Sequence, residues 1–175
     1  MFKKLALGFG IMVAGVLILA ALRSPTMQVS RELLINASPE TLFPYINNAQ
    51  KSYDWMPWAE GDPNIEIKFS GPSEGVGSKS NWKGKQMGVG SSEVTESIPN
   101  QIVKTKLEYT EPFEMSQLAE VSLTPAAGGT LVRWSVRGSN NSLFRVIGLF
   151  MDSDKMVGGE FEKGLNRLKA LTENK

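Results

Sequence analysis

Acidic side chains gather in one short stretch of the chain, between Tyr53 and Glu66. Asp54, Glu60, Asp62 and Glu66 are its four acids. Two neighbouring carboxylates can divide the work of a general acid and a general base when burial raises the pKa of one of them. This stretch is also rich in glycine and proline, and acids in such loops are usually solvated. We therefore expect no catalytic residue among them.

The aromatic residues of the same stretch suit binding rather than catalysis. Tyr53, Trp55 and Trp58 lie within the sequence YDWMPWAEGDP. Their ring faces can meet an apolar or a cationic ligand at the mouth of a pocket. The structural alternative is that these rings cap one end of a hydrophobic core, and the two roles can coexist.

The amino-acid inventory narrows the chemistry further. The 175 residues include no histidine and no cysteine. This excludes Ser–His and Cys–His nucleophilic pairs, thiolate zinc sites and disulfides. The 19 basic and 18 acidic residues give a net charge of +1, so the composition gives no sign of the basic surface that nucleic acids require. We expect no cofactor, no bound metal and no nucleic-acid partner.

Short alternating segments separated by turn residues predict an antiparallel sheet. The first strand begins at Met27 and a helix follows it, with Ser38 as N-cap and Pro39 at the first helical position. Further strands are predicted over residues 65–69, 77–83, 87–95, 101–109, 115–124 and 130–137. A last helix is predicted from Asp152 to Leu171. The economical packing is a curved sheet of about seven strands around that helix.

The last helix carries an apolar stripe that should face the sheet. The stripe consists of Val157, Phe161, Leu165, Leu168 and Leu171. Gly158 and Gly159 interrupt the helix, and each costs about 1 kcal/mol relative to alanine. A close approach of another group, or room for a ligand over the helix, can offset that cost. A kink or a later start of the helix is the alternative.

An uncharged run of eighteen residues, from Leu5 to Leu22, precedes the strands. A helix of that length covers about 27 Å, close to the thickness of one hydrocarbon core. We expect residues 1–25 to form a membrane anchor with its linker, and residues 26–175 to form one domain. The alternative is a cleaved signal peptide, although no good cleavage site follows. Lys3 and Lys4 favour a cytoplasmic N-terminus, which places the domain outside the cytoplasm.

Several segments of the sequence, taken in order, resemble the START-like superfamily, also called the polyketide cyclase/dehydrase or SRPBCC group. They are INASPETLFPYINN, WMPWAEGDP, GGTLVRWSV and the ending GLFMDSDKMVGGEFEKGLNRLKAL. The ending is similar to a membrane-anchored bacterial branch of that group. The resemblance implies an α+β helix-grip (START/Bet v 1-like) fold with an apolar cavity between the long helix and the sheet. It does not define a function, since the superfamily includes lipid carriers, metabolite binders and cyclases.

Together these observations predict a membrane-tethered domain that binds a small hydrophobic or amphipathic ligand, such as a lipid or a metabolite. The expected ligand-binding residues are Trp55, Trp58, Gln117, Trp134, Val157, Phe161 and Leu165. One alternative is a polyketide cyclase/dehydrase-like enzyme that transfers protons through Asp, Glu or Tyr, which a buried carboxylate or tyrosine in the cavity would favour. The other is a protein-interaction scaffold, in which side chains would fill the cavity.

Overall fold

The computed structural model describes residues 2–139, 142–150 and 152–173, without the side chains of residues 2–7, 9, 11, 59, 142–144 and 153. The first residue of the predicted anchor and the last two residues of the predicted domain lie outside it. The elements are α1 (Phe2–Ala21), β1 (Thr26–Ile35), α2 (Pro39–Asn47), α3 (Ala49–Ser52), α4 (Trp58–Gly61), β2 (Glu66–Ser70), β3 (Lys79–Gly84), β4 (Gly88–Ile98), β5 (Ile102–Glu111), β6 (Met115–Ala126), β7 (Gly129–Ser139), α5 (Ser142–Ile147) and α6 (Ser153–Glu173).

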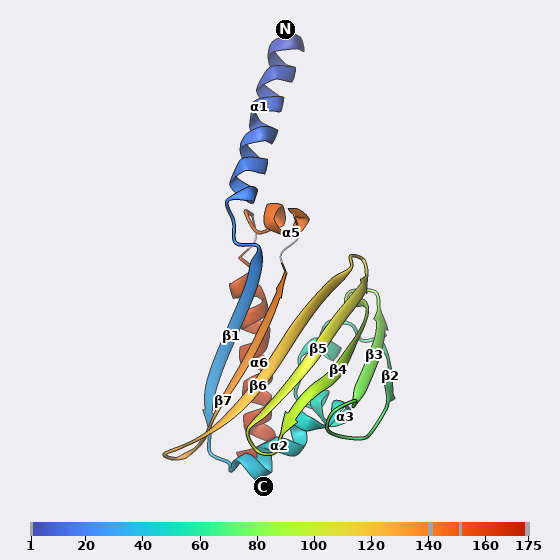
Figure 1. Cartoon of the computed structure of the whole chain (residues 1–175), viewed down its shortest axis with the longest axis vertical. Coiled ribbons are helices and arrows are strands. Elements are labelled where there is room, and N and C mark those ends of the chain that lie inside the picture. Colours follow the sequence, from blue (N-terminus) through green and yellow to red (C-terminus); the bar gives the residue numbers. More distant parts are fainter. Residues whose placement is uncertain (1, 140–141, 151, 174–175) are drawn as a thin grey trace.

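Among the described residues, seven strands form one antiparallel sheet in the order β1-β7-β6-β5-β4-β3-β2. From β2 to β7 each strand pairs with the next along the chain. β1 pairs with β7, from Thr26 opposite Ser139 to Ile35 opposite Thr130. The sheet curves around α6, which lies behind it in Figure 1. The predicted α+β architecture, a curved sheet with a long C-terminal helix, is confirmed.

The inner face of the sheet is buried because apolar residues alternate with polar ones along its strands. In β7, Val132, Trp134 and Val136 are buried, while Arg133 and Arg137 are exposed. The middle of the apolar stripe of α6 is equally buried and belongs to the same hydrophobic core. The helix therefore packs on the apolar face of the sheet, as the two periodicities predict.

The two helices predicted in the domain are present, with small shifts at their ends. The Ser38 side chain accepts a hydrogen bond from the backbone N–H of Thr41 (3.4 Å), and Pro39 is the first residue of α2. α6 begins at Ser153 and continues to Glu173. The short helices α3, α4 and α5 were not predicted, because four to six residues are too few to display a helical period.

The N-terminal helix α1 extends away from the domain, with α5 at its base (Figure 1). Leu17, Ile18 and Leu19 each expose more than half of their surface. Among the described residues, the structure contains no helix whose length and hydropathy together suit a membrane span. The structure therefore confirms a helix at this place, but it does not support the predicted transmembrane span.

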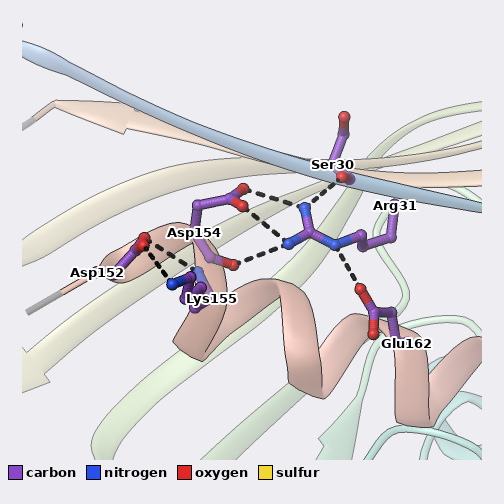
Figure 2. A network of polar contacts seen from close by, with 6 residues as sticks. All are labelled: Ser30, Arg31, Asp152, Asp154, Lys155 and Glu162. Atoms are coloured by element: carbon purple, nitrogen blue, oxygen red, sulfur yellow. Dashed lines mark hydrogen bonds and ion pairs between the residues drawn. The ribbon is translucent and has the colours of Figure 1, made fainter.

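Arg31 of β1 forms ion pairs with the N-terminal half of α6. It shares one face of the strand with Val29 and Leu33, because alternate residues of a strand face the same way, and its guanidinium meets the helix (Figure 2). It donates hydrogen bonds to both carboxylate oxygens of Asp154 (3.0 and 2.9 Å) and to Glu162 (2.7 Å). The hydrogen bond with Asp154 is the main cause that raises the pKa of Arg31, and the same bond lowers the pKa of Asp154.

Gly158 lies against the guanidinium of Arg31. A β-carbon at Gly158 would collide with that group, whereas a β-carbon at Gly159 would meet open space. The helix continues through both positions from Ser153. A close approach therefore explains Gly158, and the group that approaches is Arg31 rather than a ligand.

Replacing each of the two glycines by alanine should consequently give different results. Gly159→Ala should raise the free energy of unfolding by up to about 1 kcal/mol, since alanine favours the helix. Gly158→Ala should gain less or lose stability, because Arg31 must move away from Asp154. Denaturant unfolding measures both effects. In an Arg31→Ala background the two substitutions should become equivalent. Equal stabilisation in the wild-type background would contradict the contact.

Candidate functional site: a cavity beneath the C-terminal helix

A cavity of about 270 Å³ lies between α6, the segment of residues 46–65 and the inner face of the sheet. Its wall is mainly apolar. Leu107 and Ala119 belong to the floor on the sheet, and Val157 and Phe161 belong to the roof on α6. The volume is close to the lower end of the range for small-molecule sites, roughly 300–1,000 Å³. The side chains of the two layers therefore leave a space that suits a small molecule.

Four aromatic rings form one side of the cavity. Trp134 of β7 stacks on Phe161 of α6, with ring centroids 4.0 Å apart and 9° between the ring planes. Trp55 and Trp58 meet the Trp134 ring edge-on, at 4.9 and 6.2 Å. Gly164 makes this arrangement possible, because a β-carbon there would press on the Trp134 ring. Such a cluster gives the cavity a rigid apolar wall.

Most of the predicted ligand-binding residues lie in the cavity wall. They are Trp55, Trp58, Gln117, Trp134, Val157 and Phe161. Leu165 is not in the wall, and its side chain is 1% exposed in the hydrophobic core. Its position one helical turn beyond Phe161 explains the difference, since α6 packs directly on the core there. Contact between the wall residues and a ligand stays a prediction.

A chain of three hydroxyl groups lies on the opposite side of the cavity. The Tyr53 hydroxyl is 3.2 Å from the Oγ of Ser80, and the Oγ of Ser80 is 2.7 Å from the Oγ of Ser92. Ser80 and Ser92 lie opposite each other on β3 and β4. Ser80 is fully buried, whereas Tyr53 and Ser92 line the cavity. The chain therefore presents hydroxyl groups to the space inside.

Tyr109 of β5 adds a fourth hydroxyl group. Its ring meets Trp82 edge-on at 5.4 Å. Gly90 lies between them in the sheet, and a β-carbon there would collide with the Trp82 ring. Among the described residues, the Tyr109 hydroxyl has no hydrogen-bond partner. Tyr109 lines the cavity, so it belongs to the polar side chains of the cavity wall.

A second hollow lies over the outer face of the same strands. It is an open groove of about 750 Å³, and its lining includes Lys83 and Glu108, which alternate with the inward-facing residues of β3 and β5. Because it is open to water and carries charges of both signs, it does not suit an apolar ligand. Trp82, Tyr109 and Met115 line both hollows and therefore lie between them.

Burial raises the pKa of both tyrosines of the cavity. For Tyr53 burial is the main cause, and the hydrogen bond with Ser80 opposes it. For Tyr109 burial is again the main cause, and the nearby Tyr53 adds to it. Both phenols are therefore protonated at neutral pH, where they can donate hydrogen bonds but do not act as bases.

The two raised pKa values predict a loss of stability in alkaline solution. A phenol in the unfolded chain ionises near about pH 10, and both folded-state values lie higher. The contribution of the two phenols to the free energy of unfolding is therefore complete below about pH 10. It is lost as the pH rises through their folded-state pKa values. Ultraviolet absorbance of tyrosinate should rise at higher pH in the native protein than in the denatured one. Tyr53→Phe should remove one of the absorbance steps that occur at high pH in the native protein. Identical titration curves for the native and the denatured protein would contradict this prediction.

The acids of the aromatic segment do not line the cavity. The exposed ones are Asp54, Glu60 and Glu66. Asp62 is only 3% exposed, so the expectation that these acids are solvated is wrong for this one. Its carboxylate accepts hydrogen bonds from the backbone N–H groups of Gln86 (2.7 Å) and Met87 (3.3 Å). These bonds, above all that of Gln86, lower the pKa of Asp62, so it holds the β3–β4 turn as a carboxylate. Within the described residues no group of three or more acids could hold a metal ion.

Gln117 was predicted as a ligand-binding residue, but the inward-facing hydroxyl groups of the sheet were not predicted from the sequence. They lie at alternate positions of β3, β4 and β5, where Ser80, Ser92 and Tyr109 face inward. Alternation was the available signal, but serine on an inner face resembles serine on a solvent face. The partner of Ser80 is Tyr53, 27 residues away in the chain, and no local pattern reveals such a contact.

A curved antiparallel sheet around one long C-terminal helix, with an apolar cavity between the two, defines a helix-grip domain. The chain belongs to the family described as polyketide cyclase/dehydrase and lipid transport, whose profile matches residues 26–173. The predicted resemblance to this group is thereby confirmed, whereas the membrane-anchored branch is not tested by the match. No curated protein matches the chain.

Solved structures of low sequence identity share the fold. Protein CV1439 from Chromobacterium violaceum has a TM-score of 0.60 and 15% identity, over 85% of this chain and 97% of that one. Protein MLL2253 from Mesorhizobium loti has a TM-score of 0.60 and 20% identity, over 85% and 98%. The di-domain ARO/CYC StfQ from the steffimycin biosynthetic pathway has a TM-score of 0.60 and 11% identity, over 85% of this chain and 51% of StfQ. At these identities the comparisons establish the fold alone.

Proposed function

We propose that this protein binds a small hydrophobic or amphipathic molecule, a lipid or a metabolite, in the cavity beneath α6. The observation that supports this most strongly is the unfilled apolar space of about 270 Å³ between the helix and the sheet. Protein interiors are otherwise packed as densely as organic crystals, and a solid interaction scaffold would have no such space. The family description, which names lipid transport, supports the same function.

Native mass spectrometry of protein purified gently from its source tests this function. A bound molecule should add mass to the folded protein and leave when the protein is denatured. Uptake of N-phenylnaphthylamine, an uncharged dye that fluoresces in apolar surroundings, should give an independent signal. If the protein carries no added mass and takes up no dye, the binding function is rejected.

A second candidate function is an enzyme of the cyclase or dehydrase type. The specific observation in its favour is the pair of tyrosine hydroxyls, Tyr53 and Tyr109, in the cavity wall. With raised pKa values these groups would serve as proton donors to a substrate carbonyl rather than as bases. Mass spectrometry separates the two functions, because only an enzyme converts the co-purified molecule during incubation. Tyr53→Phe and Tyr109→Phe should then slow that conversion.

The proposal includes a membrane tether formed by the N-terminal helix. The apolar run from Leu5 to Leu22 and the exposed side chains of Leu17, Ile18 and Leu19 on α1 support it, because an isolated apolar helix needs an apolar partner. Lys3 and Lys4 favour a cytoplasmic N-terminus and an extracytoplasmic domain. A bound lipid or metabolite would then be taken up close to the membrane surface.

Cell fractionation checks the tether. The full chain should stay in the membrane pellet after a carbonate wash, and the same protein without residues 1–25 should move to the soluble fraction. The intact mass of the membrane-derived protein should include the N-terminal helix. A mature protein that begins near Arg23 would reject the tether and indicate a cleaved signal peptide.

A further inference from the structure

The polar atoms inside the cavity belong to uncharged side chains. The hydroxyl and amide side chains of the wall are those of Ser52, Tyr53, Ser78, Ser92, Thr105, Tyr109 and Gln117. The hydroxyls of Ser52 and Ser78 already donate to backbone carbonyls. None of these groups carries a charge near neutral pH. A charged molecule in the cavity would therefore find no opposite charge among the described residues of the wall, except where Glu120 contributes.

Glu120 is the one charged residue among the described residues of the wall. It lies between Ala119 and Val121 on β6, and strand alternation sends its side chain to the outer face. In the sheet it lies beside Lys104 of β5 and Ser135 of β7. Glu120 therefore contributes its backbone to the wall rather than its carboxylate. The described residues of the wall offer no charged side chain to a ligand.

The hydroxyl chain has free hydrogen-bonding capacity. Three hydroxyl groups, those of Tyr53, Ser80 and Ser92, are joined by two hydrogen bonds. Two bonds use two of the three hydroxyl hydrogens, so one hydrogen and several lone pairs are left over. Tyr109, whose hydroxyl has no hydrogen-bond partner among the described residues, lines the same cavity as Tyr53 and Ser92. These groups can donate to a carbonyl oxygen or exchange hydrogen bonds with a hydroxyl.

The polar and the aromatic sides of the cavity are well separated. Ser92 is on β4 and Trp134 is on β7, three strand steps away, which is roughly 14 Å along the sheet at about 4.8 Å per step. A molecule that fills the cavity can therefore place an apolar end against the Trp134–Phe161 stack and a polar end at the hydroxyl groups.

We propose that the cavity selects an uncharged ligand whose polar end is a hydroxyl or carbonyl group, held by the hydroxyls of Tyr53, Ser92 and Tyr109. Carboxylates and ammonium compounds of the same shape are rejected, because a buried charge without a partner must neutralise or stay in water. This inference rests on the proposed binding function and defines the chemistry of its ligand.

Competition against bound N-phenylnaphthylamine tests the selectivity on the intact protein. The competitors are 1-decanol, decanoate and decylammonium, which share one chain and differ in the charge of the end group. At about pH 8 decanoate is ionised, since carboxyl groups titrate near about pH 4. Decanol should displace the dye at a concentration at least about tenfold lower than either ion, since an unpartnered buried charge is strongly disfavoured. At about pH 4 decanoic acid should approach decanol, as protonation removes its charge.

A matched pair of variants locates the polar end. Ser92→Ala should weaken displacement by decanol about threefold to tenfold, which is the contribution of one hydrogen bond. Ser91→Ala, the neighbour on the outer face, should leave it unchanged. Equal displacement by decanol and decanoate at about pH 8 overturns the inference while the binding function stands. Equal effects of the two serine variants also overturn it. Dye uptake that fails altogether rejects the binding function and this inference with it.

Discussion

Replacing Phe161 by alanine should lower the free energy of unfolding by about 3 kcal/mol and enlarge the cavity. The side chain is 2% exposed and stacks on Trp134 at 4.0 Å. Truncation therefore removes both the burial of the ring and the stacking contact. The loss should lie at the lower end of the usual range for phenylalanine, because one side of the ring already borders the cavity. Denaturant unfolding measures the change.

Leu165→Ala is the matched control for this variant. Leu165 lies on the same helix and is equally buried, but it does not line the cavity. Its truncation should cost about 2–5 kcal/mol and leave the size selectivity of binding unchanged. Phe161→Ala should instead improve uptake of Nile red, a larger uncharged dye, relative to N-phenylnaphthylamine. If both variants shift this ratio equally, or if neither does, Phe161 does not limit the space for a ligand.

Ala119→Phe should abolish uptake of the uncharged dye without lowering stability. Ala119 lies on the floor of the cavity, between Thr105 of β5 and Val136 of β7 in the sheet. A phenylalanine ring there would extend into the unfilled space of about 270 Å³. Its apolar surface should then become buried, which favours the folded state. Affinity for the dye should fall at least about tenfold, since a ring and a ligand exclude each other in close-packed interiors.

The neighbouring position provides the control. Leu118 precedes Ala119 on β6, and strand alternation places it on the other face of the sheet. Leu118→Phe should therefore leave dye uptake at the wild-type level. Should Ala119→Phe instead destabilise the protein and still permit uptake, the space beneath α6 would not be the binding site.

The elements of the domain were predictable because each has a local signal. Ser38 and Pro39 mark the start of α2, and alternation marks strands such as β7. The stripe on α6 predicts that helix and its buried face. The same stripe placed Val157 and Phe161 in the cavity wall, but it also included Leu165, which packs in the core. Periodicity identifies the face of a helix, and it does not show where along the helix a cavity ends.

The features that were missed depend on contacts between distant parts of the chain. Arg31 meets Glu162, 131 residues away, and its guanidinium occupies the space that a side chain at Gly158 would need. The Tyr53–Ser80 hydrogen bond likewise joins a loop to a strand. Asp62 lies in a segment whose composition is typical of a solvated loop. Its carboxylate nevertheless accepts hydrogen bonds from backbone N–H groups of the β3–β4 turn. Tertiary packing decides each of these cases.

The roof of the cavity is attached by two kinds of contact that respond in opposite ways to salt. Near its N-terminus, α6 is held by the ion pairs of Arg31 with Asp154 and Glu162, whose carboxylates are largely exposed. Dissolved ions weaken the attraction between such solvent-exposed charges. Farther along, Leu165 and Leu168 are held by apolar contacts, which salting-out ions strengthen. Ionic strength therefore changes the balance between the two ends, and exchange of a bound molecule should accelerate where the ion-paired end loosens.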